Sequence, residues 1–348
     1  MTTTTLAAGF AAIERRRMTL LLAGLFMLAV SLTLDLLAGS AELSLSRIVE
    51  GILWPDSLDT RHRVILWSVR LPDALIAVSV GAALGLAGLE TQTVLNNPLA
   101  SPYTLGIASA ATLGASIAIA FGPAFPFLPM AVLMPSLALV LALAAGGLVL
   151  LLTVILGQLR ESVVLFGIAL LFFCEAALAL IYFVSNAEAV QQIVFWSIGN
   201  LTKAGWPEVG VVTLVLLLVL PFSLRQVWAL TLLRGGEEQA RSVGVDPDRL
   251  RRTAILRVSI LTSFAVCFVG VIGFIGLVAP HIARLVLGED HRYLLPGASL
   301  TGALLLSLAS WLSKTLLPGV IIPVGILTAM IGVPFFVMLI VISHRPGR

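Results

Sequence analysis

Long apolar runs separated by short polar or Pro/Gly-containing breaks recur along the whole chain. A membrane-spanning helix requires about 20 predominantly apolar residues, and about ten runs approach that length. These are residues 18–37, 75–95, 104–121, 128–156, 163–184, 209–230, 255–271, 273–287, 294–312 and 324–342. A shorter amphipathic segment, residues 43–52, is expected at the membrane interface. The pattern predicts an all-α, polytopic membrane protein whose residues 1–348 form a single transmembrane domain.

Composition supports the same conclusion. Of the 348 residues, 59% are apolar and only 11% are charged, whereas soluble domains contain about 25% charged residues. The mean hydropathy is +1.07. Cys174 and Cys267 both lie in apolar runs, so they indicate neither a disulfide framework nor a metal site.

Basic residues indicate the orientation of the chain. Three arginines, residues 15–17, precede the first apolar run without a small-residue cleavage site after them, which favours a retained anchor over a cleaved signal peptide. With a cytoplasmic N-terminus, most arginines in short loops fall on the cytoplasmic side, as the positive-inside rule requires. An even number of spans then places both termini in the cytoplasm.

Two regions resemble distorted copies of one another. Each has a Gly-rich helix, a polar break with proline and a short helix of small residues. The first copy comprises residues 81–92, 96–102 and 105–114, and the second comprises residues 270–278, 288–296 and 297–306. Their order along the topology gives them opposite orientations. Inverted repeats with broken helices are typical of transporters.

Motifs for chemistry on a substrate are absent from the sequence. It contains no G-x-x-x-x-G-K-[ST] loop, no H-E-x-x-H and no G-x-S-x-G, so nothing in it predicts a nucleotide cradle, a zinc protease or a hydrolase. The expected function is therefore transport rather than catalysis, with no cofactor bound to this chain.

Residues 233–252 form the one long loop on the expected cytoplasmic side. Glu237 and Arg241 are spaced for an i,i+4 ion pair that supports a short helix. Gly244 can end that helix, and Asp246-Pro247 can start a second. Two short helices would make a knob that a soluble partner can bind. The alternative is a solvated loop that only sets the orientation.

Motifs along nearly the whole chain after residue 18 resemble the FecCD type of ABC importer permease. This family includes permeases for ferric siderophores, haem and cobalamin. The motifs that carry the resemblance are residues 69–72 (VRLP), 81–84 (GAAL), 97–102 (NPLASP), 105–106 (LG), 273–284 (GFIGLVAPHIAR), 290–292 (DHR), 294–297 (LLPG), 322–329 (IPVGILTA) and 332–336 (GVPFF).

The resemblance implies a complete importer around this chain. It would pair with itself or with a related permease in a bacterial inner membrane, with about ten helices per subunit. Two cytoplasmic ATPases would carry ATP and Mg²⁺, and a periplasmic binding protein would deliver the substrate. The loop would then be the coupling helix that the ATPase grips, with Gly236, Glu237, Glu238, Ala240, Arg241, Gly244 and Val245 as its contact residues.

On the periplasmic face, the family uses basic residues to receive acidic side chains of the binding protein. Arg70 matches the first of these, but Asp73 stands where a second basic residue is common. Ser310 and Lys314 stand where the family usually has Asp and Arg. Arg70, Asp73 and Lys314 are the expected docking residues. The alternative for Lys314 is a lysine that snorkels to the headgroups.

Several polar residues are candidates for the translocation path. Glu175 lies midway along an apolar run, where a charged group must face protein or water; the alternative is a carboxylic acid hydrogen-bonded in helix packing. Arg160, Glu161 and Ser162 match the place of the family's cytoplasmic gate, although an ordinary loop charge pair is the slightly favoured alternative. Trp196, in the family's W-x-x-G segment, suits interfacial anchoring as well as substrate contact.

A ferric siderophore is the expected substrate, with haem and cobalamin as alternatives within the family. An ion-coupled secondary transporter is the rival from another class, because inverted repeats and a carboxylate within a span also fit that mechanism.

Overall fold

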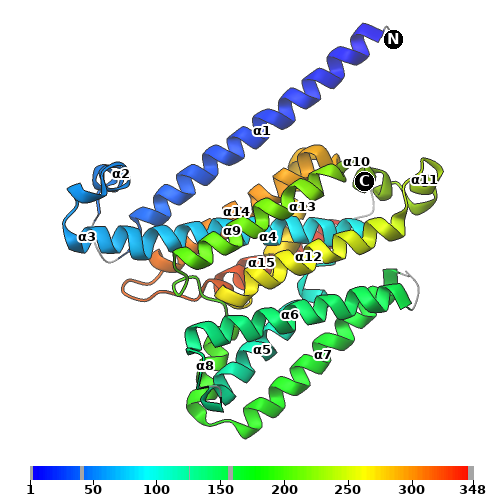
Figure 1. The fold of residues 1–348 in the computed structure, drawn as a ribbon. Helices are drawn as coiled ribbons and strands as arrows, with labels where there is room; N and C mark the ends of the chain where they lie inside the picture. The colour runs from blue at the N-terminus through cyan, green and yellow to red at the C-terminus, as the bar shows by residue number, and fades with distance from the viewer. Residues whose placement is uncertain (1–2, 40–42, 125, 156–159, 344–348) are drawn as a thin grey trace.

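The computed structural model describes residues 3–39, 43–124, 126–155 and 160–343, and all regular structure within these ranges is helical (Figure 1). The first half contains α1 (Thr3–Leu37), α2 (Leu45–Leu53), η1 (Pro55–Ser57), α3 (Thr60–Val64), η2 (Ile65–Arg70), α4 (Leu71–Val94), η3 (Tyr103–Leu105), α5 (Ile107–Phe121), η4 (Gly122–Ala124), α6 (Met130–Ile155) and α7 (Arg160–Val184). The second half contains α8 (Ala187–Ser197), α9 (Trp206–Arg225), α10 (Val227–Arg234), α11 (Glu237–Ser242), α12 (Pro247–Val269), α13 (Ile275–Leu287), α14 (His291–Thr315) and α15 (Val324–Ser343).

The helices confirm an all-α polytopic membrane protein. Seven helical stretches of the described chain are long and apolar enough to cross a membrane: Ala11–Leu37, Thr60–Val94, Met130–Ile155, Ser162–Val184, Trp206–Arg225, Pro247–Val269 and His291–Thr315. Three shorter apolar helices, Ile107–Phe121, Ile275–Leu287 and Val324–Met338, occupy the remaining predicted positions. Two of these helices are shorter than a span, and α15 is assessed only over residues 324–338, so the count of ten stays a prediction.

Three predicted boundaries were wrong. The run at residues 209–230 is divided at Gln226 into α9 and α10. Helix α12 begins at Pro247 rather than near residue 255. The prediction missed its first two turns because they are polar, and the search was for apolar runs. Residues 270–274 are not helical, so the second predicted repeat does not open with a helix at Gly270, and the inverted relation of the repeats stays a prediction.

Helix α4 lies at the centre of the bundle, surrounded by α9, α12, α13 and α14 (Figure 1). Its contact with α14 is made by glycines: a Cβ atom added at Gly81 would lie 2.4 Å from the carbonyl oxygen of Gly302. A Cβ at Gly85 would lie 2.3 Å from the carbonyl oxygen of Ala298. Within a lipid bilayer no hydrophobic force drives helices together. Small residues stabilise the bundle there because they let helix backbones approach closely. Small residues therefore pack α4 tightly against α14.

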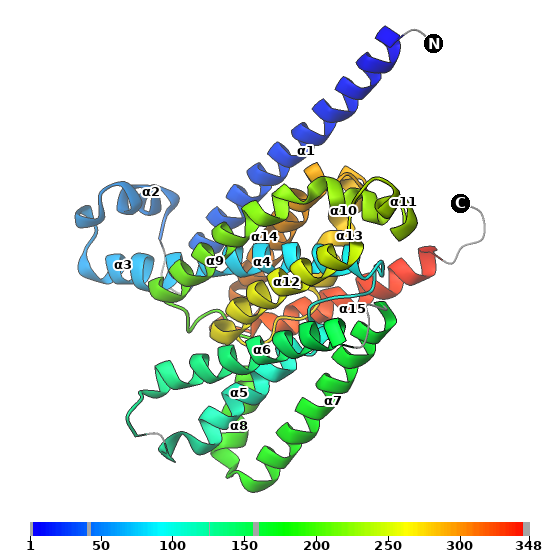
Figure 2. The ribbon, with the colours of Figure 1, turned by 45° about the vertical axis from the view of Figure 1, so that its right-hand side comes forward.

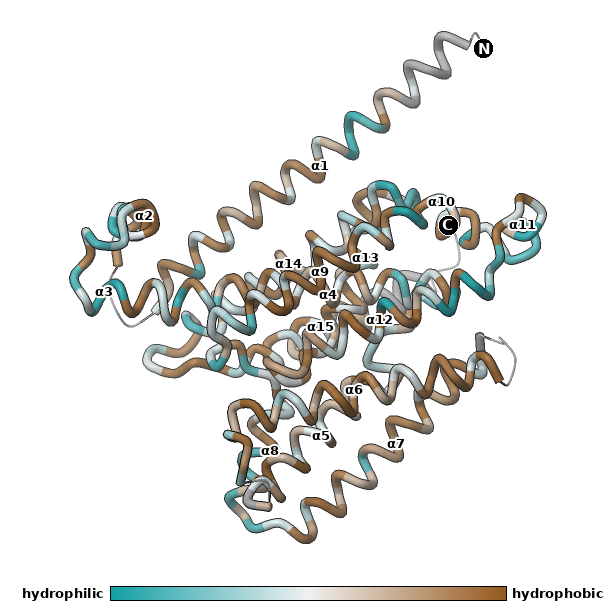
Figure 3. The backbone as a smooth tube through the Cα atoms, viewed as in Figure 1, coloured by the Kyte–Doolittle hydropathy of each residue, from teal (hydrophilic) through white to brown (hydrophobic). Residues whose placement is uncertain are grey.

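Polar segments collect at two opposite ends of the bundle (Figure 3). One end carries α2, α3 and the π-helical turn η2, and we call it the α3 end. The predicted amphipathic segment is α2, capped by Ser44, whose hydroxyl accepts from the amide of Arg47. The other end carries α10 and α11, and we call it the α11 end. Helix α15 packs against α13 and α14 and is visible along its length in Figure 2.

Candidate functional site

The predicted coupling loop forms a compact turn of helix at the α11 end. Gly236 precedes α11 with a φ of 119°, and Gly244 follows it with a φ of 86°; glycine adopts such angles without steric cost. The amides of Gly244 and Val245 donate to the carbonyls of Arg241 and Ala240, each at 3.0 Å. Two left-handed glycines thus fix the direction in which α11 leaves the membrane body.

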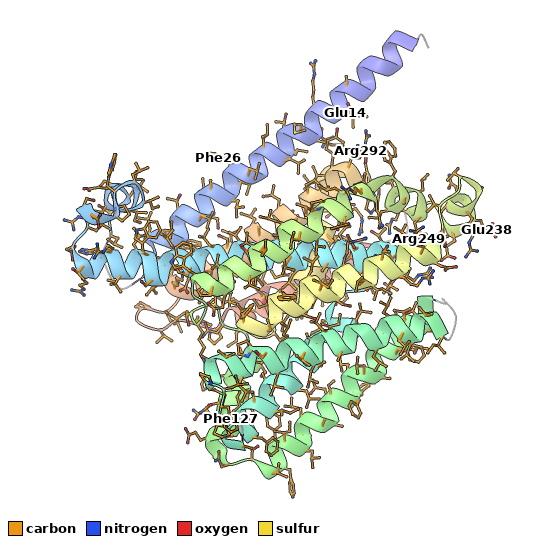
Figure 4. The ribbon with its side chains drawn as sticks, in the orientation of Figure 1. Glu14, Phe26, Phe127, Glu238, Arg249 and Arg292 are labelled. Carbon is orange, nitrogen blue, oxygen red and sulfur yellow. The ribbon has the colours of Figure 1, made fainter. Side chains whose placement is uncertain are left out.

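The side chains of α11 divide into an anchored face and an exposed face. Ala240 is buried, whereas Glu238 and Arg241 are exposed. Glu238 lies at the extreme α11 end in Figure 4, with Arg249 of α12 nearby. The predicted i,i+4 pair is present, with Arg241 Nη2 3.7 Å from Glu237 Oε2. The predicted second short helix is wrong, because the helix that starts at Pro247 continues as α12 into the bundle.

Arg251 attaches α11 to the centre of the bundle. Its side chain has no exposed surface, and its Nη2 lies 2.5 Å from Glu237 Oε1. Its Nε donates to the carbonyl oxygen of Val94 at 3.3 Å, and its Nη1 donates to Asp248 at 3.2 Å. Charge-assisted hydrogen bonds to a buried guanidinium are strong, and breaking a buried pair is costly. Sequence reasoning assigned Arg251 only to the orientation signal, and no pattern in the sequence marks it as buried.

Asp246 fixes the start of α12. Its carboxylate accepts from the amides of Asp248, at 2.9 Å, and Arg249, at 3.2 Å. The hydrogen bond from the Arg249 amide is the main cause that lowers the pKa of Asp246 below its usual value of 3.8, and the Asp248 amide adds to it. The sequence signal Asp-Pro therefore located this N-cap correctly.

A cavity of about 640 Å³ lies where α15 meets the irregular segments that precede α5 and α13. Ser101, Tyr103 and Thr104 line one side, and Phe274 and Met330 line another. None of the described residues that line it is charged. Non-helical backbone is tolerated at membrane depth where it is buried in protein or lines a cavity, and broken helices commonly mark transport sites.

Phe274 has an unusual backbone at this cavity. Its φ is 66°, and it forms the N-cap of α13; such angles are rare for a bulky residue. A Cβ atom added at Gly332 of α15 would lie 2.4 Å from the Cβ and Cγ atoms of Phe274. Only glycine at position 332 leaves room for the Phe274 ring. Sequence reasoning used Gly273-Phe274 as a family motif but did not assign Phe274 to the cavity.

The three predicted docking residues come together at the α3 end, but Arg70 and Asp73 are buried and the Lys314 side chain is only 9% exposed. Lys314 Nζ lies 3.0 Å from Asp35 Oδ1 and 3.9 Å from Asp73 Oδ2. Ser310 donates to Asp35 at 3.0 Å, and Arg70 donates to the carbonyl oxygen of Leu36 at 2.7 Å. The cluster joins α1, α4 and α14. In this structure it presents little charge to another protein, and the docking role stays a prediction.

Of the predicted path residues, Glu175 is exposed on the apolar helix α7, with Phe172 and Phe173 exposed beside it. Helix α7 begins at Arg160. The side chains of Arg160 and Glu161 lie outside the described part of the chain, and Ser162 is half-buried. The predicted gate therefore stays a prediction.

Glu90 has a structural role. Its carboxylate is buried and accepts from Arg257 Nε at 2.9 Å, which links α4 to α12. The W-x-x-G segment also has a packing role. A Cβ atom at Gly270 would lie 2.2 Å from the carbonyl oxygen of Trp196, and one at Gly199 would lie 2.3 Å from that of Val271. These glycines let the end of α8 pack against the end of α12.

Comparison with known proteins agrees with this arrangement. The sequence profile of the FecCD transport family matches residues 27–342. The chain is 38% identical over 321 residues to the Fe(3+) dicitrate transport system permease protein FecD of Escherichia coli, covering 90% of this chain and 98% of that protein. It is 36% identical to the hemin transport system permease protein HmuU of Yersinia pestis, covering 92% and 95%.

A solved structure of a metal-chelate type ABC transporter in an inward-facing conformation has the same fold. It superimposes with a TM-score of 0.82 at 29% sequence identity, covering 92% of this chain and 98% of the other.

Proposed function

The chain belongs to the FecCD transport family, and from that premise we propose that it is the permease through which a bacterial importer moves a ferric siderophore from the periplasm to the cytoplasm. The family comprises permeases of metal-chelate type ABC importers, which are transport components without an ATPase site of their own. Hydrolysis of ATP would thus take place on partner subunits that bind ATP and Mg²⁺.

The observation that carries the proposal is helix α11, a short protruding helix that Arg251 connects to the rest of the bundle. An ATPase that grips the exposed Glu238 and Arg241 would pull on a helix that Arg251 connects to the C-terminal carbonyl of α4. Val94 directly precedes the connection to α5, in which Ser101, Tyr103 and Thr104 line the 640 Å³ cavity. A movement of α11 would therefore be transmitted to the cavity wall through two contacts of Arg251, one with Glu237 and one with the Val94 carbonyl.

A second permease subunit, either a copy of this chain or a related one, would complete the path. Helix α7 exposes Phe172 and Phe173 beside Glu175, and α15 exposes Met330 and Val337. A carboxylate within an apolar span is costly unless it faces protein or water. Pairing of these faces would place Glu175 along a central path. The binding protein would approach the α3 end, and both chain termini would lie in the cytoplasm.

The nature of the substrate is supported by the relatives and by the cavity. The named substrates of FecD and HmuU are both iron complexes. The cavity walls offer aromatic and aliphatic surface with a few hydroxyl groups, which suits a bulky chelate that a binding protein has already selected. Haem and cobalamin remain the alternatives for the same site.

Reconstituted transport tests the proposal. The chain, its ATPase subunits and its binding protein are placed in liposomes, and uptake of a ferric siderophore, haem and cobalamin is compared with and without ATP. Uptake of the ferric siderophore that requires both ATP and the binding protein is the expected result. ATP-dependent uptake of haem or cobalamin alone would overturn the choice of substrate but not that of mechanism.

The exposed Glu175 favours one second candidate, a transporter driven by an ion gradient. The same liposomes distinguish the two mechanisms. Uptake that follows a proton or sodium gradient and proceeds without the ATPase subunits would replace the ATP-driven mechanism. Glu175→Gln would then abolish uptake, whereas an ATP-driven permease would retain it.

A further inference from the structure

A carboxylate at the α11 end joins the last turn of α10 to the end of α13. Helix α13 is followed by Gly288, whose φ of 80° glycine adopts without steric cost. The next residue, Glu289, reaches the last residue of α10, where Arg234 Nη2 donates to Glu289 Oε1 at 3.0 Å. Gly235 and Gly236 alone separate Arg234 from α11. Glu289 therefore contacts the segment that carries α11.

The second oxygen of the same carboxylate contacts α13 itself. Arg284 Nε lies 3.2 Å from Glu289 Oε2, and the Arg284 side chain is only 11% exposed. The carboxylate thus lies between two guanidinium groups, one on α10 and one on α13. Two cations at such short range repel each other. The charge of Glu289 therefore makes the contact between α10 and α13 attractive, and without it the two arginines would favour separation.

Arg284 also connects the end of α13 to a buried amide of α4. Its Nη2 donates to Gln92 Oε1 at 3.2 Å, and Gln92 Nε2 donates to the carbonyl oxygen of Leu277 at 3.2 Å. Gln92 has no exposed surface. Leu277 lies in the first turn of α13 and lines the 640 Å³ cavity together with Phe274. Arg284 and Gln92 thus fix the position of α13 beside that cavity.

Helix α13 can carry a displacement from its end to the cavity. It has 13 residues, which at 1.5 Å per residue make a rod of about 20 Å. It begins after Phe274, on one side of the cavity, and ends beside Glu289. Ser101, on another side of the cavity, lies in the connection that follows α4, the helix that Arg251 links to α11. Two sides of the cavity therefore have separate polar connections to the segment around α11.

We propose that Glu289 is a positioning residue that couples α10 to α13, so that movement of α11 also displaces the Phe274 side of the cavity. The inference rests on the ATP-driven mechanism proposed above. Glu289 does not line the cavity, so it acts through Arg234 and Arg284. The connection through Arg251 moves α4 and the connection through Glu289 moves α13, and together they displace both sides of the path in one step.

Liposomes that contain the chain, its ATPase subunits and its binding protein test this coupling. Glu289→Gln replaces the carboxylate by an uncharged group of the same size. Glu14→Gln is the matched control, because the Glu14 side chain is 50% exposed against 46% for Glu289 and also pairs with an arginine, Arg292, at 3.6 Å. The measurements are the ATP hydrolysed per imported ferric siderophore, and hydrogen exchange with and without ATP at residues 97–104 and 275–279.

The transport measurement should show a moderate loss of coupling. Because Glu289 is partly exposed, solvent limits the strength of its ion pairs, and we expect the ratio of ATP to imported siderophore to rise about threefold in Glu289→Gln. The ratio should be unchanged in Glu14→Gln. Arg234→Gln should have the same effect as Glu289→Gln, and the double variant should be little worse than either, because both substitutions break one connection.

Hydrogen exchange separates this coupling from a general loosening of the fold. In Glu289→Gln the ATP-dependent change at residues 275–279 should fall at least twofold, whereas the change at residues 97–104 is kept. Arg251→Gln should show the reverse pattern, since its contacts lead to α4. A merely structural role of Glu289 would reduce both changes equally.

Three results would overturn the inference while the unaltered protein still imports siderophore with ATP. These are equal losses at both segments, a Glu289→Gln protein that behaves like Glu14→Gln, and additive defects of Arg234→Gln and Glu289→Gln. Siderophore uptake by the unaltered protein that does not depend on ATP would instead overturn the proposed mechanism, and this inference with it.

Discussion

Replacing Arg251 by glutamine tests whether α11 is rigidly connected to the transport path. The substitution removes the contacts to Glu237, Asp248 and the Val94 carbonyl and leaves a shorter, neutral polar side chain. The knob itself, including exposed Glu238 and Arg241, is unchanged. We therefore expect the ATPase subunits to bind and hydrolyse ATP, but the movement of α11 to be transmitted poorly to α4.

The size of the effect follows from burial. Breaking a fully buried ion pair costs about 3–5 kcal/mol. The Glu237 side chain is 26% exposed, so water reduces the penalty, and we expect about 1–3 kcal/mol. Every 1.4 kcal/mol changes an equilibrium tenfold. If the anchored position of α11 is destabilised by about 1.4 kcal/mol, the equilibrium that favours it falls tenfold. The number of ATP molecules hydrolysed per imported chelate should then rise about tenfold.

The assay measures ATP hydrolysis and chelate uptake in the same liposomes, so that coupling is separated from assembly. Arg249→Gln is the matched control, because Arg249 is exposed and lies on the same helix two residues earlier. It should transport with the unaltered ratio. Glu237→Asp should partly preserve coupling, since it keeps the charge. An unaltered ratio in Arg251→Gln, or an equal defect in Arg249→Gln, would refute the connection.

Three further predictions concern stability. Gly302→Val should lower the unfolding temperature, because a Cβ there would lie 2.1 Å from the carbonyl oxygen of Gly81 and overpacking costs about 1–3 kcal/mol; Gly147→Ala, which has open space, should not. Lys314→Gln should also lower it, by up to about 3–5 kcal/mol of unfolding free energy, because Asp35 is left buried without its cation; an unchanged melting curve with weaker binding-protein affinity would contradict this and favour docking. The lowered pKa of Asp246 means that its capping contribution is present above the unfolded value of 3.8 and is lost as pH falls through the still lower folded value; hydrogen exchange at the start of α12 should rise there, and should lose this pH dependence in Asp246→Asn.

The sequence was most informative where local chemistry determines structure. The i,i+4 pair of Glu237 and Arg241, the glycine at 244 and the Asp246-Pro247 start all lie within a dozen residues, and each forms as predicted. The length of α12 was missed for a local reason too, since basic residues at its start interrupt the apolar run without interrupting the helix.

Contacts between distant residues could not be predicted in the same way. The pairing of Glu90 with Arg257 joins positions 167 residues apart, and no periodicity connects them. The same applies to Lys314 with Asp35: a lysine near the end of a spanning helix looks alike in sequence whether it reaches the headgroups or a buried aspartate. Side-chain burial depends on which helices become neighbours, and a hydropathy pattern contains no such information.

The absence of formal charge among the described residues around the 640 Å³ cavity has a consequence for how selectivity could evolve. A wall of aromatic, aliphatic and hydroxyl groups holds a passing cargo weakly, so it neither traps one chelate nor strongly rejects another of similar bulk. Discrimination can then be changed by exchanging the soluble receptor alone, and one conduit could serve several receptors without alteration of its own lining.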